Sequence, residues 1–267
     1  MNPIRDIDTK YLIMLSLLLF AITIAGYEYV SYMRHLENPM DKLFPHISDI
    51  VSKFIKYATV EDKRTGDLLL WKDTFASLKI FFTAITISLI MGTITGILMG
   101  LYSVFRGLLL NFVIFLSIVP PLAILPILLI SFGVGFESKI ALIIIGTYPI
   151  IALLIYQNVK QINKEEIIKA LTLGVSSFQL SYKVIFQRSI PSILEALRVA
   201  NGMGWLLLIA AEAISAKEGL GYRIYLVRRF LAMDVIFGYV LWIVFLAFII
   251  DITLKMIINK KYPWFYK

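Results

Sequence analysis

The 267-residue chain contains no cysteine and only two histidines, His35 and His46. The absence of cysteine excludes disulfides, zinc–thiolate sites and thiol catalysis. Because both histidines fall in one polar loop, we expect neither a histidine-based metal site nor a histidine acid–base pair. The serines and carboxylates form no nucleophile–base arrangement either, so the sequence predicts neither a catalytic residue nor a metal site.

Charge is also scarce in this chain. Charged residues make up 16% of the sequence and hydrophobic residues 59%, whereas a soluble domain carries about 25% charged residues. This composition indicates an integral membrane protein surrounded by lipid. The net charge is +8, which we attribute to lysines and arginines in membrane-flanking loops, so nucleic acid is not an expected partner.

Six apolar runs are long enough to cross a bilayer, which requires roughly 20 residues for each helix. We therefore predict an all-α, polytopic membrane protein, because lipid requires every backbone hydrogen bond to be made internally. The first run is expected to be a retained span, since acidic residues precede it and no A-x-A cleavage site follows. The six predicted spans are residues 11–31, 75–102, 108–132, 139–157, 193–215 and 235–258.

Three prolines are expected to disturb the helix of the third predicted span, because each removes a backbone donor: Pro120, Pro121 and Pro126.

The chain is expected to consist of two regions. We predict a first region, 1–74, that holds one span and an external loop, and a core region, 75–267. In the loop, apolar residues at helical spacing predict an amphipathic helix on the outer membrane surface or against the bundle: Ile47, Ile50, Val51, Phe54 and Ile55.

Residues 160–191 are predicted to form a water-compatible helical hairpin between the fourth and fifth spans. Residues 164–173 suit a helix, and Gly174 is expected to end it in the left-handed conformation. Ser176 and Gln179 have the spacing of a capping box for a second helix, with Val175 and Leu180 as its hydrophobic staple.

The second half of this hairpin carries aromatic residues. At α-helical spacing, Phe178, Tyr182 and Ile185 share one face, which we expect to be exposed. Pro191 then suits the first turn of the fifth span. The residues alone leave two interpretations open: a knob that docks in a partner's groove, or a plain connecting loop.

The hairpin resembles the EAA motif of permease subunits of ATP-binding-cassette importers. Ala170, Gly174 and Pro191 occupy motif positions, whereas Ile168, Lys169 and Gln187 depart from the pattern. Residues 117–143 and 197–224 resemble the nitrate/sulfonate/taurine/bicarbonate branch of that family. The matching residues in the second stretch are Arg198, Trp205, Glu212, Gly219, Gly221 and Tyr222, and the resemblance runs from about residue 73 to the end.

The resemblance implies a type I importer permease fold, with two copies forming the pore as a homodimer. Each hairpin would dock on a separate ATP-binding cassette ATPase subunit, and a periplasmic or lipid-anchored solute-binding protein would deliver a small anion such as a sulfonate, taurine, nitrate or bicarbonate. The chain lacks the phosphate-binding pattern G-x-x-x-x-G-K-[ST], so it needs no cofactor of its own, and ATP and magnesium would reside on the ATPase.

Location and orientation also follow from the resemblance. The protein would lie in the cytoplasmic (inner) membrane of a bacterium or archaeon, with both termini and the hairpin in the cytoplasm. Lysines and arginines are divided evenly between the two sides, so the positive-inside rule does not decide the orientation.

Ionisable residues inside spans are costly and mark functional or packing sites; four occur here: Lys79, Arg198, Glu212 and Asp251. Arg198, Trp205 and Glu212 are spaced seven apart, with Asn201 on the same helix face. In one interpretation this face lines the translocation path and Arg198 attracts an anion. In the other, Arg198 snorkels to the interface and Glu212 pairs with an external cation. Lys79 and Asp251 are expected at interfaces or between helices.

Small residues in and after the fifth span have expected roles as well. Gly202 and Gly204 are predicted to permit close helix contact. Gly219, Gly221 and Tyr222 are predicted to form a tight external turn, near three arginines that either meet a binding protein or form a solvated corner: Arg223, Arg228 and Arg229.

A self-sufficient secondary transporter or channel is the alternative class. Such proteins often have ten or more spans, internal repeats or helices broken at the midplane. This chain is short and has no internal repeat, so the alternative is weaker. A membrane enzyme ranks third, since the sequence contains no catalytic constellation.

Overall fold

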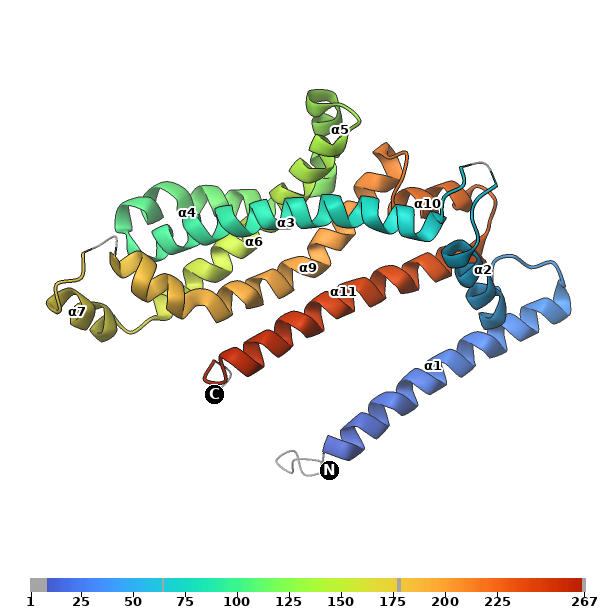
Figure 1. Ribbon diagram of the computed structural model, residues 1–267, viewed down its shortest axis with the longest axis horizontal. Coiled ribbons are helices and arrows are strands. Elements are labelled where there is room, and N and C mark those ends of the chain that lie inside the picture. Colours follow the sequence, from blue (N-terminus) through green and yellow to red (C-terminus); the bar gives the residue numbers. More distant parts are fainter. Residues whose placement is uncertain (1–8, 64, 177–178, 266–267) are drawn as a thin grey trace.

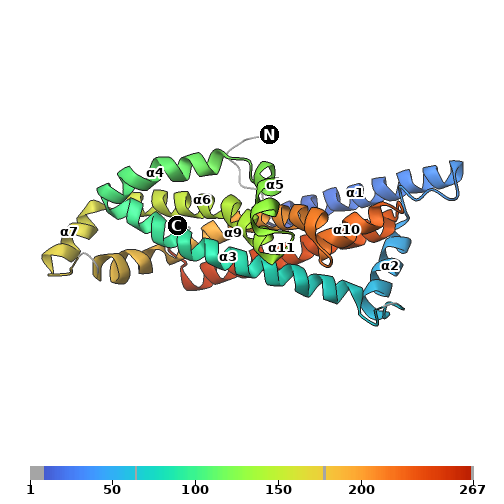
Figure 2. The same cartoon turned by 90° about the horizontal axis from the view of Figure 1, so that it is seen from above.

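The computed structural model describes residues 9–63, 65–176 and 179–265 and is an elongated bundle of helices (Figure 1; Figure 2). The described residues contain no strand. In chain order the helices are α1 (Thr9–Glu37), α2 (Ile47–Thr59), α3 (Leu69–Leu101), α4 (Ser103–Ile118), α5 (Pro121–Phe132), α6 (Phe136–Gln161), α7 (Lys164–Thr172), the π-helix η1 (Leu180–Phe186), α9 (Gln187–Ser215), α10 (Leu220–Arg228) and α11 (Met233–Lys261).

Five helical stretches in the described chain are long and apolar enough to cross a membrane: α1, α3, α6, α11 and the continuous stretch Leu180–Ile214. A sixth crossing results when α4 and α5 are counted together. The all-α, six-span prediction is confirmed in this sense. The chain runs back and forth along the long axis, with α7 at one end and α2 and α10 at the other (Figure 1).

The prediction that residues 108–132 form one membrane-spanning helix is wrong. These residues belong to two helices, α4 and α5, which are bent by 97° at the break between Ile118 and Pro121. Pro120 and Pro121 lack the backbone N–H groups that would continue α4, and the first of them precedes α5 as its N-cap. Two adjacent prolines thus do more than kink the helix; they end it, whereas the isolated Pro126 is accommodated inside α5.

The seam between α3 and α6 is built on a row of glycines. Gly92, Gly96 and Gly100 recur every fourth residue on α3 and face α6. A Cβ atom on Gly96 would lie 2.8 Å from the Ala152 carbonyl oxygen, and one on Gly100 would lie 2.5 Å from the Val159 side chain. Helix backbones can approach this closely in a membrane only where side chains are absent.

The interior contains two main apolar clusters. One lies around Phe81 of α3, Leu142 of α6 and Leu208 of α9, all fully buried. The other joins the far halves of α6 and α9 to η1, through Ile155 and Ile185. The bundle is therefore packed along its length, from the α10 end to the η1 end.

The predicted amphipathic helix is confirmed as α2. It packs against α11 and α3, with Ile50 buried and the Phe54 ring 5.7 Å from that of Trp242. Val51 and Ile55, on the same predicted stripe, remain about half exposed. The helix lies against the bundle with one side and leaves an apolar edge uncovered.

Helix α1 is set apart from the bundle (Figure 1). Among its residues whose side chains are described, only Ser31 is buried. The Ser31 hydroxyl donates to the Phe44 carbonyl at 2.8 Å, and the Tyr27 hydroxyl donates to the Pro45 carbonyl at 2.8 Å. These bonds, together with an ion pair between Arg34 and Asp41, hold the second half of α1 to the following loop.

Candidate functional site

The hairpin between α6 and α9 begins with a capped helix. The Asn163 side chain accepts a hydrogen bond of 3.0 Å from the Glu165 N–H, which satisfies one free donor at the start of α7. Glu165 and Glu166 in the first turn complement the positive end of the helix dipole. The first half of the hairpin is therefore a helix encoded by its own sequence.

Gly174 ends this helix in the left-handed conformation, with φ of 81°. The Gly174 N–H donates to the Leu171 carbonyl and the Val175 N–H to the Ala170 carbonyl, at 3.0 and 3.3 Å. This pair of bonds is a Schellman motif, for which a residue without a Cβ is favoured. The predicted stop at Gly174 is confirmed, and Ala170 is half-buried against the second apolar cluster.

The predicted capping box is present after the turn. The Ser176 N–H donates to Gln179 Oε1 at 3.1 Å, and the Gln179 N–H donates to Ser176 Oγ at 3.3 Å. Val175 and Leu180, the predicted staple pair, both belong to the second apolar cluster. The turn is thus fixed from both sides, which sets the angle between α7 and the following helix.

The exposed face predicted for the second helix is only partly found. Tyr182 is 60% exposed, whereas Ile185 is fully buried in the second apolar cluster, so its predicted exposure is wrong. The cause is the winding: residues 180–186 form a π-helix, whose i to i+5 bonds widen the turn and place positions three apart on different faces. Phe178 lies outside the described residues.

The fifth span also begins earlier than predicted. α9 starts at Gln187 and continues directly from η1, so the buried Pro191 lies inside the helix and not in the first turn of a new one. On α7 and the turn, Ile168 and Leu173 remain exposed. With Tyr182 they give the hairpin exposed apolar side chains on an otherwise charged and polar element.

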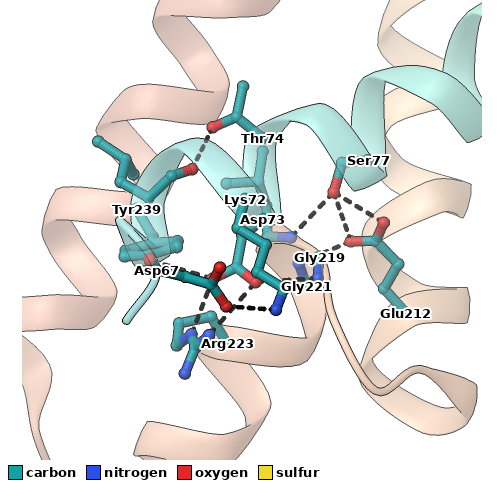
Figure 3. Close-up of polar contacts among 12 residues, drawn as sticks. Asp67, Lys72, Asp73, Thr74, Ser77, Glu212, Gly219, Gly221, Arg223 and Tyr239 are labelled. Atoms are coloured by element: carbon teal, nitrogen blue, oxygen red, sulfur yellow. Dashed lines mark hydrogen bonds and ion pairs between the residues drawn. The ribbon is translucent and has the colours of Figure 1, made fainter. Parts of the chain in front are cut away.

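A second polar constellation lies at the opposite end, where α3 and α9 meet the start of α10 (Figure 3). The Gly219 N–H donates to Asp73 Oδ1 at 3.1 Å, and the Leu220 N–H donates to Ser77 Oγ at 2.9 Å. The Gly221 N–H donates to Glu212 Oε2 at 2.8 Å. Three N–H groups that the helix itself leaves free are thereby satisfied by buried side chains.

Further contacts close this cluster. Arg223 Nε donates to Asp73 Oδ2 at 2.8 Å and the Tyr239 hydroxyl donates to the same oxygen at 3.2 Å. The Ser77 hydroxyl lies 2.7 and 2.9 Å from the two carboxylate oxygens of Glu212. Asp73, Ser77 and Glu212 are all fully buried. The carboxylates therefore hold α3, α9, α10 and α11 together as acceptors for fixed donors.

The predicted tight turn at Gly219, Gly221 and Tyr222 is instead the start of α10. Gly219 has φ of 119°, and a Cβ atom there would lie 2.6 Å from the Glu212 carboxylate. A Cβ on Gly221 would lie 2.5 Å from the Ile209 carbonyl oxygen. Both glycines are buried, and only Tyr222 is partly exposed, so the glycines serve close packing on Glu212.

Arg198 is engaged by carboxylates. Its guanidinium donates to Asp251 at 2.9 and 3.1 Å and to Glu195 at 2.9 and 3.2 Å. The expectation that Asp251 is an interhelical partner is confirmed, because this pair joins α9 to α11. Asn201, one turn further along, donates from Nδ2 to the Ala247 carbonyl at 3.0 Å.

Trp205 faces another neighbour. Its ring stacks on Phe81 of α3, with centroids 4.8 Å apart and planes at 23°. Arg198, Trp205 and Glu212 therefore do not present one open face: the first contacts α11 and the other two contact α3. Within the described part of the chain Glu212 forms no ion pair with a lysine or arginine; it accepts hydrogen bonds from the Ser77 hydroxyl and the Gly221 N–H.

Four buried polar atoms on α9 have no hydrogen-bond partner among the described residues: Ser189 Oγ, Ser192 Oγ, Asn201 Oδ1 and Trp205 Nε1. Leaving such atoms unsatisfied is costly, so they are candidates for contact with a bound molecule. Lys79 places its ammonium 5.6 Å from the Phe136 ring centroid, an exposed cation–π contact. Of the two expected packing glycines, Gly204 touches Phe81 and Ile85, whereas Gly202 has open space around it, so that expectation holds for one of them.

Several residues of these networks were missed by the sequence reasoning. Asp73, Ser77 and Tyr239 are central to the α10 cluster, and Lys139, a buried lysine at the start of α6, was not singled out. Asp73 lies two residues before the predicted second span, within the predicted loop. The signal that would have found it is the combination of an acidic residue and a serine four positions later on one helix face.

Known proteins resemble this chain over most of its length. The family model for the binding-protein-dependent transport system inner membrane component matches residues 74–261. The taurine transport system permease protein TauC of Escherichia coli is 36% identical over 198 residues, covering 74% of this chain and 72% of TauC. A putative ABC transporter permease protein of Methanocaldococcus jannaschii is 30% identical over 259 residues, covering 97% and 94% of the two chains.

A further relative and a solved structure agree with these matches. The putative aliphatic sulfonates transport permease protein SsuC of E. coli is 32% identical over 146 residues, covering 55% of this chain and 56% of SsuC. A chain of the MetNI methionine ABC transporter, solved in inward-facing conformations, superposes with a TM-score of 0.62 at 18% identity, over 72% of this chain and 95% of that one. The protein thus has the type I permease fold and belongs to the family of binding-protein-dependent transport system inner membrane components.

Proposed function

We propose that the chain is the permease subunit of an ATP-driven importer for a small anionic solute, coupled through the α7–η1 hairpin to a separate ATPase subunit. The observation that carries the proposal is the hairpin itself. Its turn is fixed by a Schellman motif and a capping box, while Ile168, Leu173 and Tyr182 remain exposed on it. A rigid element with uncovered apolar side chains is suited to a partner's groove.

The energy for transport would come from the partner. The sequence has no phosphate-binding loop, so ATP and magnesium belong to the ATPase and this chain has no cofactor of its own. Closure of two ATPases would move the hairpins and switch the permease between inward- and outward-facing states. Two copies of the chain as a homodimer would supply the two hairpins.

The substrate class rests on the relatives. Taurine and aliphatic sulfonates, named for TauC and SsuC, are small sulfonates. We propose a sulfonate or a similar small anion for this chain, with nitrate and bicarbonate as further members of the class. Selectivity would reside mostly in an external binding protein, and identifying the ligand that copurifies with that protein tests the assignment.

The contacts divide the predicted path residues into two groups. Arg198 and Glu212 are held by interhelical partners, so we assign them to the joints between helices. Asn201 and Trp205 retain buried polar atoms without a partner in the described chain, so we assign them to the solute path. The binding protein would meet the end that carries Tyr222 and the exposed Arg228 and Arg229, opposite the hairpin.

We propose that the hairpin lies in the cytoplasm, where the ATPase would be. Six crossings put the first turn of α1 and the last turn of α11 on the same side as α7, so both termini would also be cytoplasmic. The membrane would be the cytoplasmic membrane of a bacterium or archaeon. Labelling of a cysteine introduced at Leu173 from the outside of intact cells would contradict this orientation.

The docking test removes exposed apolar groups from the hairpin. We expect the double substitution Leu173→Ser and Tyr182→Ser to reduce copurification of the ATPase subunit about tenfold or more, because interface anchors commonly contribute over 1 kcal/mol each. The amount of folded permease in the membrane should not change, since both side chains are exposed.

The matched control is Met40→Ser with Phe230→Ser, two exposed apolar residues away from the hairpin. These changes should leave ATPase association intact. Unchanged association in the hairpin variant, or uptake by the chain alone in liposomes without an ATPase, would overturn the proposed coupling.

A further inference from the structure

A cavity of about 500 Å³ lies where the ends of α3 and α6 meet the start of α4 and the hairpin. Arg106 of α4 and Lys160 of α6 are its charged lining residues, and no carboxylate lines it in the described chain. The cavity is separate from both the α10 cluster and the unpaired atoms on α9, and none of the proposed roles uses it.

The two cations are available for a ligand. Arg106 is half-buried, and its guanidinium has no partner among the described residues. Among the described residues, the Lys160 ammonium has one hydrogen-bond partner, the Tyr156 hydroxyl, at the long distance of 3.4 Å; it lies 5.7 Å from the centre of that ring. A half-buried guanidinium without a counter-ion is costly, and a bound anion would offset that cost.

The cavity lies at the depth of the membrane surface. Two spans end beside it, α3 at Leu101 and α6 at Gln161. Tyr102, which is typical of a membrane–water interface, lines it, and the Tyr102 hydroxyl is 2.9 Å from Ser181 Oγ of η1. The remaining walls are largely apolar: Leu101, Val159, Ile162, Ile167, Leu171 and Leu180.

We propose that this cavity binds the headgroup of an anionic phospholipid. Arg106 and Lys160 would contact the phosphate, and the apolar walls would take the first part of an acyl chain, which continues over Val104 and Leu108, exposed on α4. Basic pockets between transmembrane helices at the surface recognise lipid headgroups in this way. A free inorganic anion has the same charge but gains nothing from the apolar walls.

The site connects lipid to the hairpin. Ile167 and Leu171 belong to α7 and Leu180 belongs to η1, so a bound lipid would touch both halves of the hairpin. The inference requires only that α3 and α6 cross the membrane, and it holds whether or not the hairpin docks on an ATPase. Its consequence is that lipid composition changes the mobility of residues 164–172.

The test counts lipids that remain on the purified full-length chain. The chain is reconstituted in vesicles of phosphatidylcholine and phosphatidylglycerol at a ratio of about 7:3, extracted in mild detergent and analysed by native mass spectrometry. We expect retained phosphatidylglycerol on the wild type, and about thirty-fold weaker retention in the Arg106→Gln, Lys160→Gln variant, from two cations near the surface. The control, Lys260→Gln with Lys261→Gln, removes the same charge elsewhere.

Hydrogen exchange supplies the second measurement. Amides of residues 164–172 should exchange more slowly in phosphatidylglycerol-containing nanodiscs than in pure phosphatidylcholine, and this difference should disappear in the Arg106, Lys160 variant. Equal phosphatidylglycerol retention by the cavity and control variants would overturn the proposal. So would displacement of the lipid by inorganic phosphate, because a site for a simple anion would bind free phosphate as well.

Discussion

Helices α1 and α3 are both apolar enough to cross a membrane, yet they relate to the bundle in opposite ways. In the most apolar 18-residue stretch of each helix, none of the α1 residues and half of the α3 residues are buried. α3 supplies the glycine row that faces α6 and the two buried side chains that cap α10. α1 supplies a few hydrogen bonds to the loop that follows it.

The difference shows what hydropathy does and does not specify. Apolar composition is sufficient to place a helix in lipid, because lipid solvates leucine as well as a protein interior does. Close packing between helices depends instead on small residues and on buried polar groups at defined positions. α3 has both, in Gly96 and Asp73, whereas a Cβ on Gly26, the one glycine of α1, would meet only open space.

The largest loss of stability is expected from removing the buried carboxylate of α3. Asp73→Ala should lower the free energy of unfolding by about 3–5 kcal/mol, because it leaves Arg223 largely buried without its partner and the Gly219 N–H unsatisfied. Denaturant titration in detergent micelles measures the change. Asp67→Ala removes a carboxylate from an exposed pair with Lys72 and should cost less than about 1 kcal/mol; equal losses in the two variants would contradict the assigned role.

A smaller loss of stability is expected from placing a side chain in the glycine row of α3. Gly96→Leu should cost about 1–3 kcal/mol, since the new side chain meets the Ala152 carbonyl oxygen and Ile155. Gly26→Leu on α1 should change stability by less than about 0.5 kcal/mol, because nothing lies within 4 Å of the added Cβ. Thermal unfolding of the two purified variants makes the comparison, and a tolerated leucine at position 96 would show that the seam is loose.

The smallest effect is expected at the attachment of α1. Hydrogen bonds from the Leu43 N–H and then from Arg34 hold the pKa of Asp41 below its usual value. A depressed pKa means that the stabilisation is complete above the unfolded value of about 3.9 and is lost as the pH falls through the folded value. A spin label at Met40 should therefore be more mobile at about pH 3 than at about pH 6. Asp41→Asn should remove this pH dependence. A label that is equally mobile at both pH values in the wild type would argue against a stabilising role for the Arg34–Asp41 ion pair.

The local features of the hairpin were predictable because they are made by neighbours in the sequence. Asn163, Gly174, Ser176 and Gln179 each act within a few residues, so their types and spacing were sufficient. The same holds for α2, whose apolar stripe has one period throughout. Secondary structure of this kind is determined by residues close together in the sequence, so helix-propensity and capping rules predict it directly.

The features that were not predicted depend on residues far apart. Glu212 meets Ser77, and Arg198 meets Asp251, across sequence separations of 135 and 53 residues. A helical wheel placed both ionisable groups on one face with Trp205, but it could not show which neighbour covers that face. Ile185 is buried, against the prediction, for a different reason: the predicted face follows the α-helical period, whereas this segment winds as a π-helix.

The continuity of η1 and α9 has a mechanical consequence. The helical backbone is unbroken from Leu180 to Ser215, so the hairpin and the carboxylate that caps α10 are parts of one rod. At 1.5 Å for each residue, η1 and Glu212 are about 40 Å apart along this helix. A displacement of η1 must therefore either bend the helix or also move Glu212, which binds the first turn of α10. The π-helical segment and Pro191, at the near end, are the places where such a rod yields first.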